Sequence, residues 1–305
     1  MSVFVKRNAR DCAFTSSDSW VILSPIELSI KSKIEARGVP LRDWGVNIYR
    51  GILTGCNEAF IIDQKRRDEI LSWCRDAAER KRTEQIIRPI LRGRDIKRYG
   101  YEWAGLYLIA THNGYGKTPR IDIDNYPAIK KHLDMHWFEI SKRSDKGDSP
   151  YNLRNCAYMD DFAKPKIVWA DLARTGNAFI YDEEGFTSPN TTYLIASEDS
   201  SMLKYLIGIL NSKAILRYLD WISAKLDNTG WRWFKEYVET FPIPCISKGR
   251  LLPIVELVNR ILGKRVSNPT ADTASEEFEI DNLVYRLYGF TPEEIEVMEN
   301  PQNHC

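Results

Sequence analysis

Carboxylates grouped with a lysine are the residues of this sequence whose types best fit hydrolytic chemistry. Asp160 and Asp161 precede Lys166, and Asp171 follows it. A metal-dependent nuclease needs such residues at short spacing on adjoining strands, where the acids hold the ion that activates water. The chain contains 42 acidic residues, so loose acid–lysine combinations of this kind arise by chance. A diverged nuclease that uses Asp160, Asp161 and Lys166 is therefore an alternative and not the main hypothesis.

Other catalytic signatures are missing from the sequence. No two prolines are adjacent, so the Asp/Asn-Pro-Pro-Tyr/Phe loop with which an adenine methyltransferase holds a flipped base is absent. The stretch from Asn113 to Lys117 lacks the glycine spacing of a dinucleotide loop, and neither a P-loop nor a Gly-x-Ser-x-Gly elbow occurs. The six cysteines form no Cys-x-x-Cys pair, and the four histidines have no ligand spacing with them. We therefore expect no catalytic residue, no metal site and no cofactor in this chain.

Charge is distributed unevenly along a chain whose net charge is only +1. Between Arg80 and Gly100, eight lysines or arginines stand against two acidic residues. Between Glu276 and Glu299, eight acidic residues stand against a single arginine. The first segment suits an anionic partner such as a phosphate backbone, and the second does not.

The centre of the basic segment is the run Arg-Gly-Arg-Asp-Ile-Lys-Arg, which contains Arg92, Arg94, Lys97 and Arg98. Guanidinium groups match phosphate oxygens and guanine edges, and a glycine lets the backbone approach a ligand closely. We interpret the run as a phosphate clamp. A solvated basic turn in which Asp95 is paired internally is the alternative.

Three loops carry side chains suited to base edges. Thr54 and Asn57 lie in a loop between two expected strands, Arg174 and Thr175 lie at a loop tip, and Asn190 follows a Ser-Pro pair. Arginine and asparagine are the side chains that best match guanine and adenine. Ordinary turn geometry is the alternative for each of these loops, and it is the favoured interpretation for the loop of Arg174 and Thr175. Arg50, Lys166 and Arg232, the last set among tryptophans, complete the predicted contact set.

Local patterns predict the elements that must position these side chains. Ser24-Pro25-Ile26-Glu27 is typical of a capped helix start, and Thr291 caps another helix. Residues 48–52 and 59–62 are expected to form a hairpin. Strands are expected at 166–169, 178–181 and 192–195, with Trp169 in the core, and helices at 201–219, 251–264 and 276–288.

Several blocks, in order, resemble the TaqI-like C-terminal specificity domain of adenine-N6 methyltransferases and type IIG restriction–modification enzymes. The resemblance runs from about residue 20 to residue 299. Its most specific blocks lie at 50–63, 89–99, 164–169, 188–193, 210–212 and 241–244. Residues 280–290 are similar to the helical tail of the same enzymes.

The resemblance implies a domain that grips double-stranded DNA opposite a methyltransferase domain and selects the target sequence. It implies an α+β fold, in which a mixed sheet is flanked by helices and followed by a small C-terminal helical subdomain. We expect a helical lead-in at 1–45, the target-recognition domain at 46–245 and the helical subdomain at 246–305. The catalytic half is missing, so the chain is either an excised piece or a separate specificity subunit. S-adenosylmethionine and Mg²⁺ are then expected in methyltransferase and endonuclease domains, linked in cis or in trans.

Two broader expectations complete the sequence-based hypothesis. No secretory signal and no 18-residue apolar run occur, which favours reduced thiols, a cytoplasmic location and no membrane partner. A third possible function is a protein-interaction module that docks through its acidic helical tail. Steep salt dependence would distinguish DNA binding from that possibility.

Overall fold

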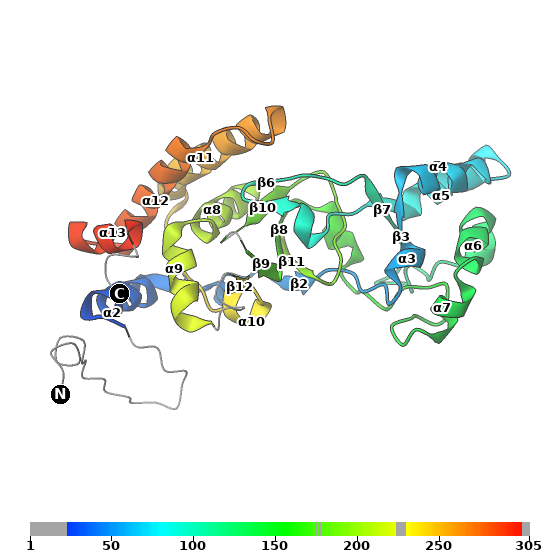
Figure 1. The fold of residues 1–305 in the computed structure, drawn as a ribbon, viewed down its shortest axis with the longest axis horizontal. Helices are drawn as coiled ribbons and strands as arrows, with labels where there is room; N and C mark the ends of the chain where they lie inside the picture. Colours follow the sequence, from blue (N-terminus) through cyan, green and yellow to red (C-terminus); the bar gives the residue numbers. More distant parts are fainter. Residues whose placement is uncertain (1–22, 175, 177, 224–229, 301–305) are drawn as a thin grey trace, which may run out of the picture.

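A four-stranded antiparallel sheet lies at the centre of the protein (Figure 1). The structure is a computed structural model, and it describes residues 23–174, 176, 178–223 and 230–300. The strand order is β10-β8-β11-β2, with bounds Phe179–Asp182, Lys166–Ala170, Thr192–Ala196 and Ile48–Arg50. The three strands expected between residues 166 and 196 are confirmed.

Alternation along the strands divides the core into two clusters on opposite faces of this sheet. Ile167 and Trp169 of β8 belong to one cluster, whereas Val168 between them belongs to the other. Successive side chains of a strand point to opposite faces, and both faces of this sheet are covered, so β8 is buried throughout. The predicted core position of Trp169 is confirmed, because its side chain is buried against Phe179 and Tyr193.

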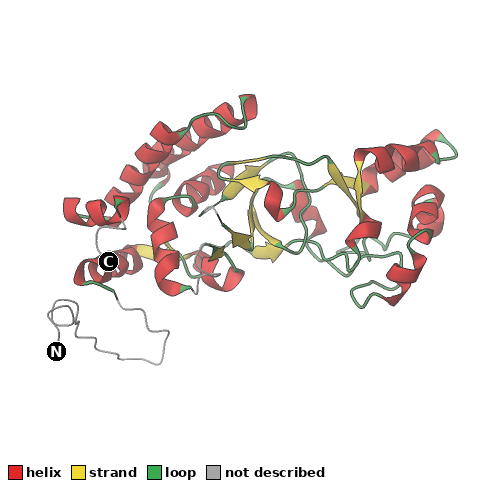
Figure 2. Cartoon of the chain, in the orientation of Figure 1, coloured by secondary structure: helices red, strands yellow, loops and turns green. Residues whose placement is uncertain are grey.

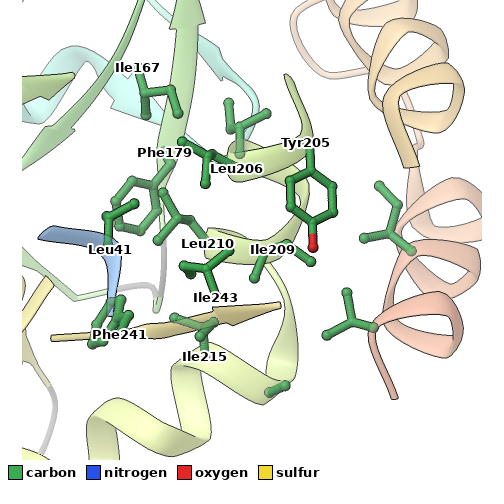
Figure 3. Close-up of a cluster of buried hydrophobic side chains, with 14 of the residues drawn as sticks. Leu41, Ile167, Phe179, Tyr205, Leu206, Ile209, Leu210, Ile215, Phe241 and Ile243 are labelled. Carbon is green, nitrogen blue, oxygen red and sulfur yellow. The ribbon is translucent and has the colours of Figure 1, made fainter. Parts of the chain in front are cut away.

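Helices cover the first face and share one core with the C-terminal part of the chain. They are α2 (Pro25–Arg37), α8 (Ser200–Leu210), α9 (Lys213–Ile222), α11 (Lys248–Ser267), α12 (Ala274–Tyr288) and α13 (Pro292–Glu299). Figure 3 shows Ile167 and Phe179 of the sheet packed with Leu206 and Leu210 of α8. The predicted capping boxes at Ser24 and Thr291 are both present. The helix expected over 201–219 is divided at Asn211, whose side-chain amide bonds the backbone of Phe179.

A second lobe covers the other face and extends to the far end of the molecule (Figure 1). Its sheet has the order β3-β7-β4, with bounds Ile61–Asp63, Leu106–Ile109 and Ile87–Pro89. Its helices are α3 (Asn57–Phe60), α4 (Gln64–Ser72), α5 (Ala77–Ile86), α6 (Pro127–Asp134) and α7 (Trp137–Lys142). Figure 2 shows that the strands stand between these helices and the central sheet.

The expected hairpin of residues 48–62 is wrong. Ile48–Arg50 pairs with β11 in the central sheet, and Ile61–Asp63 pairs with β7 in the second sheet. Residues 57–60 between them form the short helix α3. The segment therefore crosses from one sheet to the other, because each half finds its strand partner in a distant part of the chain.

Short paired segments complete the fold. β1 (Gly38–Pro40) pairs with β13 (Pro242–Pro244), β5 (Ile96–Lys97) with β6 (Gly100–Tyr101), and β9 (Leu172–Ala173) with β12 (Trp231–Arg232). The short helix α10 (Lys235–Val238) follows β12, and 3-10 turns occur at Leu41–Asp43, Gly93–Asp95, Ile123–Asn125 and Met159–Ala163.

The predicted α+β class is confirmed, with one difference in its sheet. Across the residues that the structure describes, the named strands form separate antiparallel sheets, and parallel pairing is confined to the isolated bridges Ile52–Pro189 and Ile90–Thr187. Within the described ranges, the helices are too short or too polar to cross a membrane. The proposed domain boundaries at residues 45 and 245 stay predictions.

Acidic residues of the C-terminal helices pair with cations elsewhere in the chain. Glu277 pairs with Arg98, Glu294 with Lys33 at 2.6 Å, and Glu299 with Lys213. These contacts tie α12 and α13 to the basic turn, to α2 and to α9. Part of the acidic charge is therefore engaged within the chain.

Candidate nucleic-acid interface

A cleft of about 640 Å³ lies beside one end of the central sheet. Its lining comes from the starts of α3 and β3, the turn that leads into β5, the segment from the end of β8 to the start of β10, and the loop before β11. Six residues of the predicted contact set line this cleft, namely Asn57, Arg92, Arg94, Lys97, Arg174 and Asn190. The fold thus brings half of the predicted set, from distant parts of the sequence, into one hollow.

The basic turn reaches this cleft because Gly93 has no side chain. A Cβ atom on Gly93 would lie 3.1 Å from the Cβ of Ala170, the last residue of β8, and 3.7 Å from the carbonyl oxygen of Thr191. The 3-10 turn Gly93–Asp95 therefore packs directly against the sheet. This close packing brings Arg94 and Lys97 to the rim of the cleft.

Arg92 stabilises the turn from within. Its Nε and Nη2 atoms donate to the two carboxylate oxygens of Asp95, at 3.1 and 2.7 Å, and Asp95 also accepts the backbone N–H of Arg92 at 2.9 Å. The hydrogen bonds that Arg92 donates to this buried carboxylate raise the pKa of its guanidinium. Asp95 is thus paired internally, as the alternative interpretation expected, and Arg92 acts mainly as a brace for its neighbours.

Exposed cations line the cleft. Arg94 is exposed, and its guanidinium makes no hydrogen bond or ion pair with any described residue. Lys97 is exposed, with Glu102 at 3.6 Å and half of both side chains open to solvent. Such exposed pairs contribute little free energy and yield readily to a phosphate. Arg174 is exposed on the opposite wall.

Arg50 fixes the loop that carries Asn190. Its Nε donates to the carbonyl oxygen of Asn190 at 2.6 Å, and its guanidinium lies 5.7 Å from the centre of the Tyr193 ring. The backbone N–H of Asn190 donates to the carbonyl oxygen of Ile52 at 3.0 Å. These bonds leave the Asn190 side-chain amide without a partner in the described structure, on a loop held at both sides.

The prediction for Thr54 is wrong in its role. Thr54 is only 3% exposed, and its Oγ1 donates to Oδ1 of Asn57 at 2.6 Å. Its carbonyl oxygen accepts from the buried guanidinium of Arg143. Thr54 therefore orients Asn57, which is exposed and lines the cleft, and does not itself reach the surface.

Lys166 is also corrected. Its side chain is fully buried, with Nζ 2.5 Å from Oδ2 of Asp182 and 2.6 Å from the carbonyl oxygen of Phe162. Both faces of β8 are covered, so a side chain on either face of this strand lies inside the molecule. Lys166 is a structural cation and cannot contact a phosphate in this arrangement.

Arg98 does not line the cleft. It pairs with Glu277 of α12, and its guanidinium lies 5.5 Å from the centre of the Tyr99 ring. Tyr99 has a positive φ of 59°, which turns the chain between β5 and β6. Arg98 therefore joins the basic turn to the C-terminal helices, and its assignment as a contact residue is corrected.

Arg232 does not line the cleft. Arg232 is half-buried on β12 opposite Leu172, which does line the cleft, and the Nε of Arg232 has no hydrogen-bond partner among the described residues. Thr175 lies outside the described residues.

Sequence reasoning missed two polar residues of the cleft. Asp171 joins β8 to β9 and is half-buried there, and burial raises the pKa of its carboxyl group while Arg50 opposes that shift. Thr191 is exposed beside Asn190. The signal for Asp171 was its place directly after a buried strand, but its pairing with Lys166 in a nuclease-like pattern obscured it.

A smaller hollow of about 250 Å³ adjoins the same loop. Arg50 and Asn190 line it together with Arg154 and Asn155. Arg154 is exposed, and its nearest anion is Asp145 at 3.4 Å. Cationic and amide side chains thus continue past Asn190 onto a second surface.

The nuclease-like residues do not share a site. Asp161 pairs with Lys164 at 2.7 Å, whereas Lys166 is buried against Asp182. In the parts of the chain that the structure describes, no group of three or more His, Cys, Asp or Glu side chains is arranged to hold a metal ion.

Two curated type II methyltransferases are similar to this chain. M.BanIII of Aneurinibacillus aneurinilyticus is 25% identical over 190 residues, which is 60% of this chain and 32% of that protein. M.PaeR7I of Pseudomonas aeruginosa is 22% identical over 281 residues, which is 91% of this chain and 44% of that protein. The chain thus spans less than half the length of the curated relatives it matches.

A solved structure shares the fold. The type IIL restriction–modification enzyme MmeI, solved in complex with DNA, matches 82% of this chain with a TM-score of 0.60 and 15% identity, over 34% of its own chain. The model of the TaqI-like C-terminal specificity domain matches residues 88–243, which is just over half of the chain. This match includes the basic turn, most of the central sheet and the loop of Asn190, and the chain therefore belongs to the family of TaqI-like C-terminal specificity domains.

Proposed function

We propose that this chain binds double-stranded DNA and selects its sequence as the specificity part of a type II restriction–modification protein. The observation that carries the proposal is the cleft in which Arg94, Lys97 and Arg174 are exposed beside the amides of Asn57 and Asn190. Cations at such a surface position a duplex through its phosphates, and amides distinguish bases at their edges. The family and the DNA in the MmeI structure support the same role.

The cations that pair with acidic residues within the chain define the limits of this surface. Arg98 and Lys166 are engaged inside the protein, so the proposed phosphate contacts are Arg94, Lys97, Arg174 and Arg50 at the loop beside the cleft. Arg92 supports the turn, and Asn57 and Asn190 are proposed to inspect base edges.

Catalysis is assigned to other domains. The relatives are more than twice as long as the region that this chain matches, and they are named as methyltransferases. We place adenine-N6 methylation and any DNA cleavage in those domains, in cis or in trans. S-adenosylmethionine and Mg²⁺ would be bound there, and the assembled protein would work in the cytoplasm, where the DNA is.

Salt dependence tests whether phosphates are the ligand. The affinity of the wild-type chain for a labelled 30-base-pair duplex is measured by fluorescence anisotropy across a range of salt concentrations. Each neutralised phosphate contributes roughly −0.9 to the slope of log affinity against log salt. Four contacts therefore predict a slope of about −3 to −4. Absence of duplex binding, or binding insensitive to salt, contradicts the proposal and favours a protein partner.

A matched pair of variants locates the contact. Arg94→Ala with Lys97→Ala should weaken binding to all duplexes alike and make the slope shallower by about 2. The control is Lys248→Ala with Arg250→Ala, which removes the same charge from exposed positions on α11, a helix that does not line the cleft. Equal losses in the two double variants would place the contact elsewhere. Selection from a randomised duplex pool, followed by sequencing, identifies the preferred site.

A further inference from the structure

One acidic residue stands in the cationic cleft. Asp171 lines it together with Arg92, Arg94, Lys97 and Arg174. Its carboxylate makes no ion pair with any described residue, although the charge of Arg50 and the backbone N–H groups of Leu172 and Asp171 favour its ionised form. A surface that only had to attract phosphates would gain by losing this charge, because a carboxylate repels every phosphate that approaches it.

The backbone fixes the position of Asp171 on both sides. Its N–H donates to the carbonyl oxygen of Thr191 at 3.0 Å, and its carbonyl oxygen accepts the N–H of Trp233 at 2.9 Å. The preceding residue, Ala170, is held against Gly93. Asp171 is thus attached to the end of β8, an inner strand of the central sheet, where a contact residue keeps its geometry before the ligand arrives.

An ionised carboxylate only accepts hydrogen bonds, so its ligand must be a donor. In the major groove of DNA, the hydrogen-bond donors are the amino groups of cytosine (N4) and adenine (N6). Cytosine suits a carboxylate better, because adenine places the acceptor N7 next to its amino group and repels a second acceptor. Asp171 is half-buried, so bound DNA would displace much of the water that remains around its carboxylate. If the carboxylate gained no hydrogen-bond donor in exchange, binding would be weaker.

We propose that Asp171 determines sequence specificity by accepting a hydrogen bond from the exocyclic amino group of a base in the major groove, cytosine first and adenine second. This proposal rests on the proposed function and names one of its base-reading residues. Non-specific attraction comes from the arginines and lysines, whereas the carboxylate penalises every base that presents only acceptors at its position.

The test compares Asp171→Asn with the wild-type chain. Sites selected from a randomised duplex pool should contain one position of strong cytosine or adenine preference. In Asp171→Asn the preference at that position should fall about tenfold, and the other positions should keep theirs. Affinity for an unrelated duplex should stay the same or increase, because a negative charge has gone. Glu102→Gln is the charge-matched control, since Glu102 is exposed near Lys97 and does not line the cleft; it should leave every preference unchanged.

A base analogue identifies the contacted atom. Replacing the selected cytosine with pyrimidin-2-one, which lacks the amino group, should weaken wild-type binding about tenfold and leave Asp171→Asn unaffected. Purine in place of adenine is the corresponding probe if the selected base is adenine. If the wild-type chain binds no duplex, the proposed function fails and this assignment fails with it. If the wild-type chain selects a site and Asp171→Asn selects it equally well, only the assignment is overturned. A merely structural Asp171 would lower affinity for all duplexes together, which also overturns it.

Discussion

Arg50 and Asn190 are joined by a hydrogen bond of 2.6 Å, from the Nε of the arginine to the carbonyl oxygen of the asparagine. The bond links the last residue of β2 to the loop before β11, and 140 positions separate the two residues in the sequence. A cation that attracts DNA thereby also holds a loop that is proposed to read it. We therefore expect a change at Arg50 to alter both the affinity for DNA and the discrimination between DNA sequences.

Replacing Arg50 separates these two roles. Arg50→Lys keeps the charge but loses the planar fork that bonds Asn190 and lies over Tyr193. We expect affinity for a random duplex to stay within about twofold, and discrimination between the selected site and a random duplex to fall several-fold. Arg50→Ala should reduce both quantities. Anisotropy titrations with the two duplexes measure the split, and unchanged discrimination in Arg50→Lys would contradict the bracing role.

The approach of Gly93 to the sheet predicts a rescue. Gly93→Ala brings a methyl group to about 3.1 Å from the Cβ of Ala170, closer than most such contacts. We expect a loss of about 1 kcal/mol of unfolding free energy from this overpacking, together with weaker duplex binding as the turn shifts. Ala170→Gly removes the opposing methyl group, so the double variant should bind better than Gly93→Ala alone. Denaturant titration and anisotropy follow the two effects.

Lys166 is expected to matter for stability and not for binding. Lys166→Ala leaves the buried carboxylate of Asp182 without its cation, which typically costs about 3–5 kcal/mol. The fraction of the variant that remains folded should bind a duplex with the wild-type affinity and salt slope. Lys166→Met with Asp182→Asn, which removes both charges, should recover part of the stability. If Lys166→Ala kept its stability but bound the duplex more weakly, Lys166 would have to be assigned to the contact surface.

Asp281 predicts a pH dependence of stability. Burial raises the pKa of its carboxyl group to about 6, against the opposing effects of the Lys213 backbone N–H and of Arg98. The folded state therefore holds this proton more tightly than the unfolded state. Its contribution to stability is complete below about pH 4 and is lost as the pH rises to about 6. Asp281→Asn keeps the acceptor for Lys213 and should remove this part of the pH dependence. The difference in unfolding free energy between the two proteins, measured from pH 4 to 7, should change by about 2–3 kcal/mol; a constant difference would contradict the raised pKa.

The sequence predicted well those elements that are stabilised by interactions between residues close together in the chain. The capping boxes at Ser24 and Thr291 need only residues three positions apart, and both are present. The alternation of Ile167, Val168 and Trp169 marks a strand covered on both sides. The hairpin prediction was wrong because β2 and β3 each pair with a strand from a distant segment. The residues between β2 and β3 carry no local signal of these distant partners.

The sequence by itself determined the family, the main strands and helices, and the basic segment that carries the candidate surface. Only the tertiary structure decided which cations remain exposed, because that depends on partners far away in the chain. Arg94 and Arg98 have the same side chain four positions apart, yet one lines the cleft and the other is taken by Glu277. Lys166 likewise pairs inside the protein with Asp182, a residue of the neighbouring strand, and is therefore not exposed to a ligand. The position of Asp171 among the cations follows from the packing of Gly93 against Ala170, a contact between separate elements that local sequence patterns do not record.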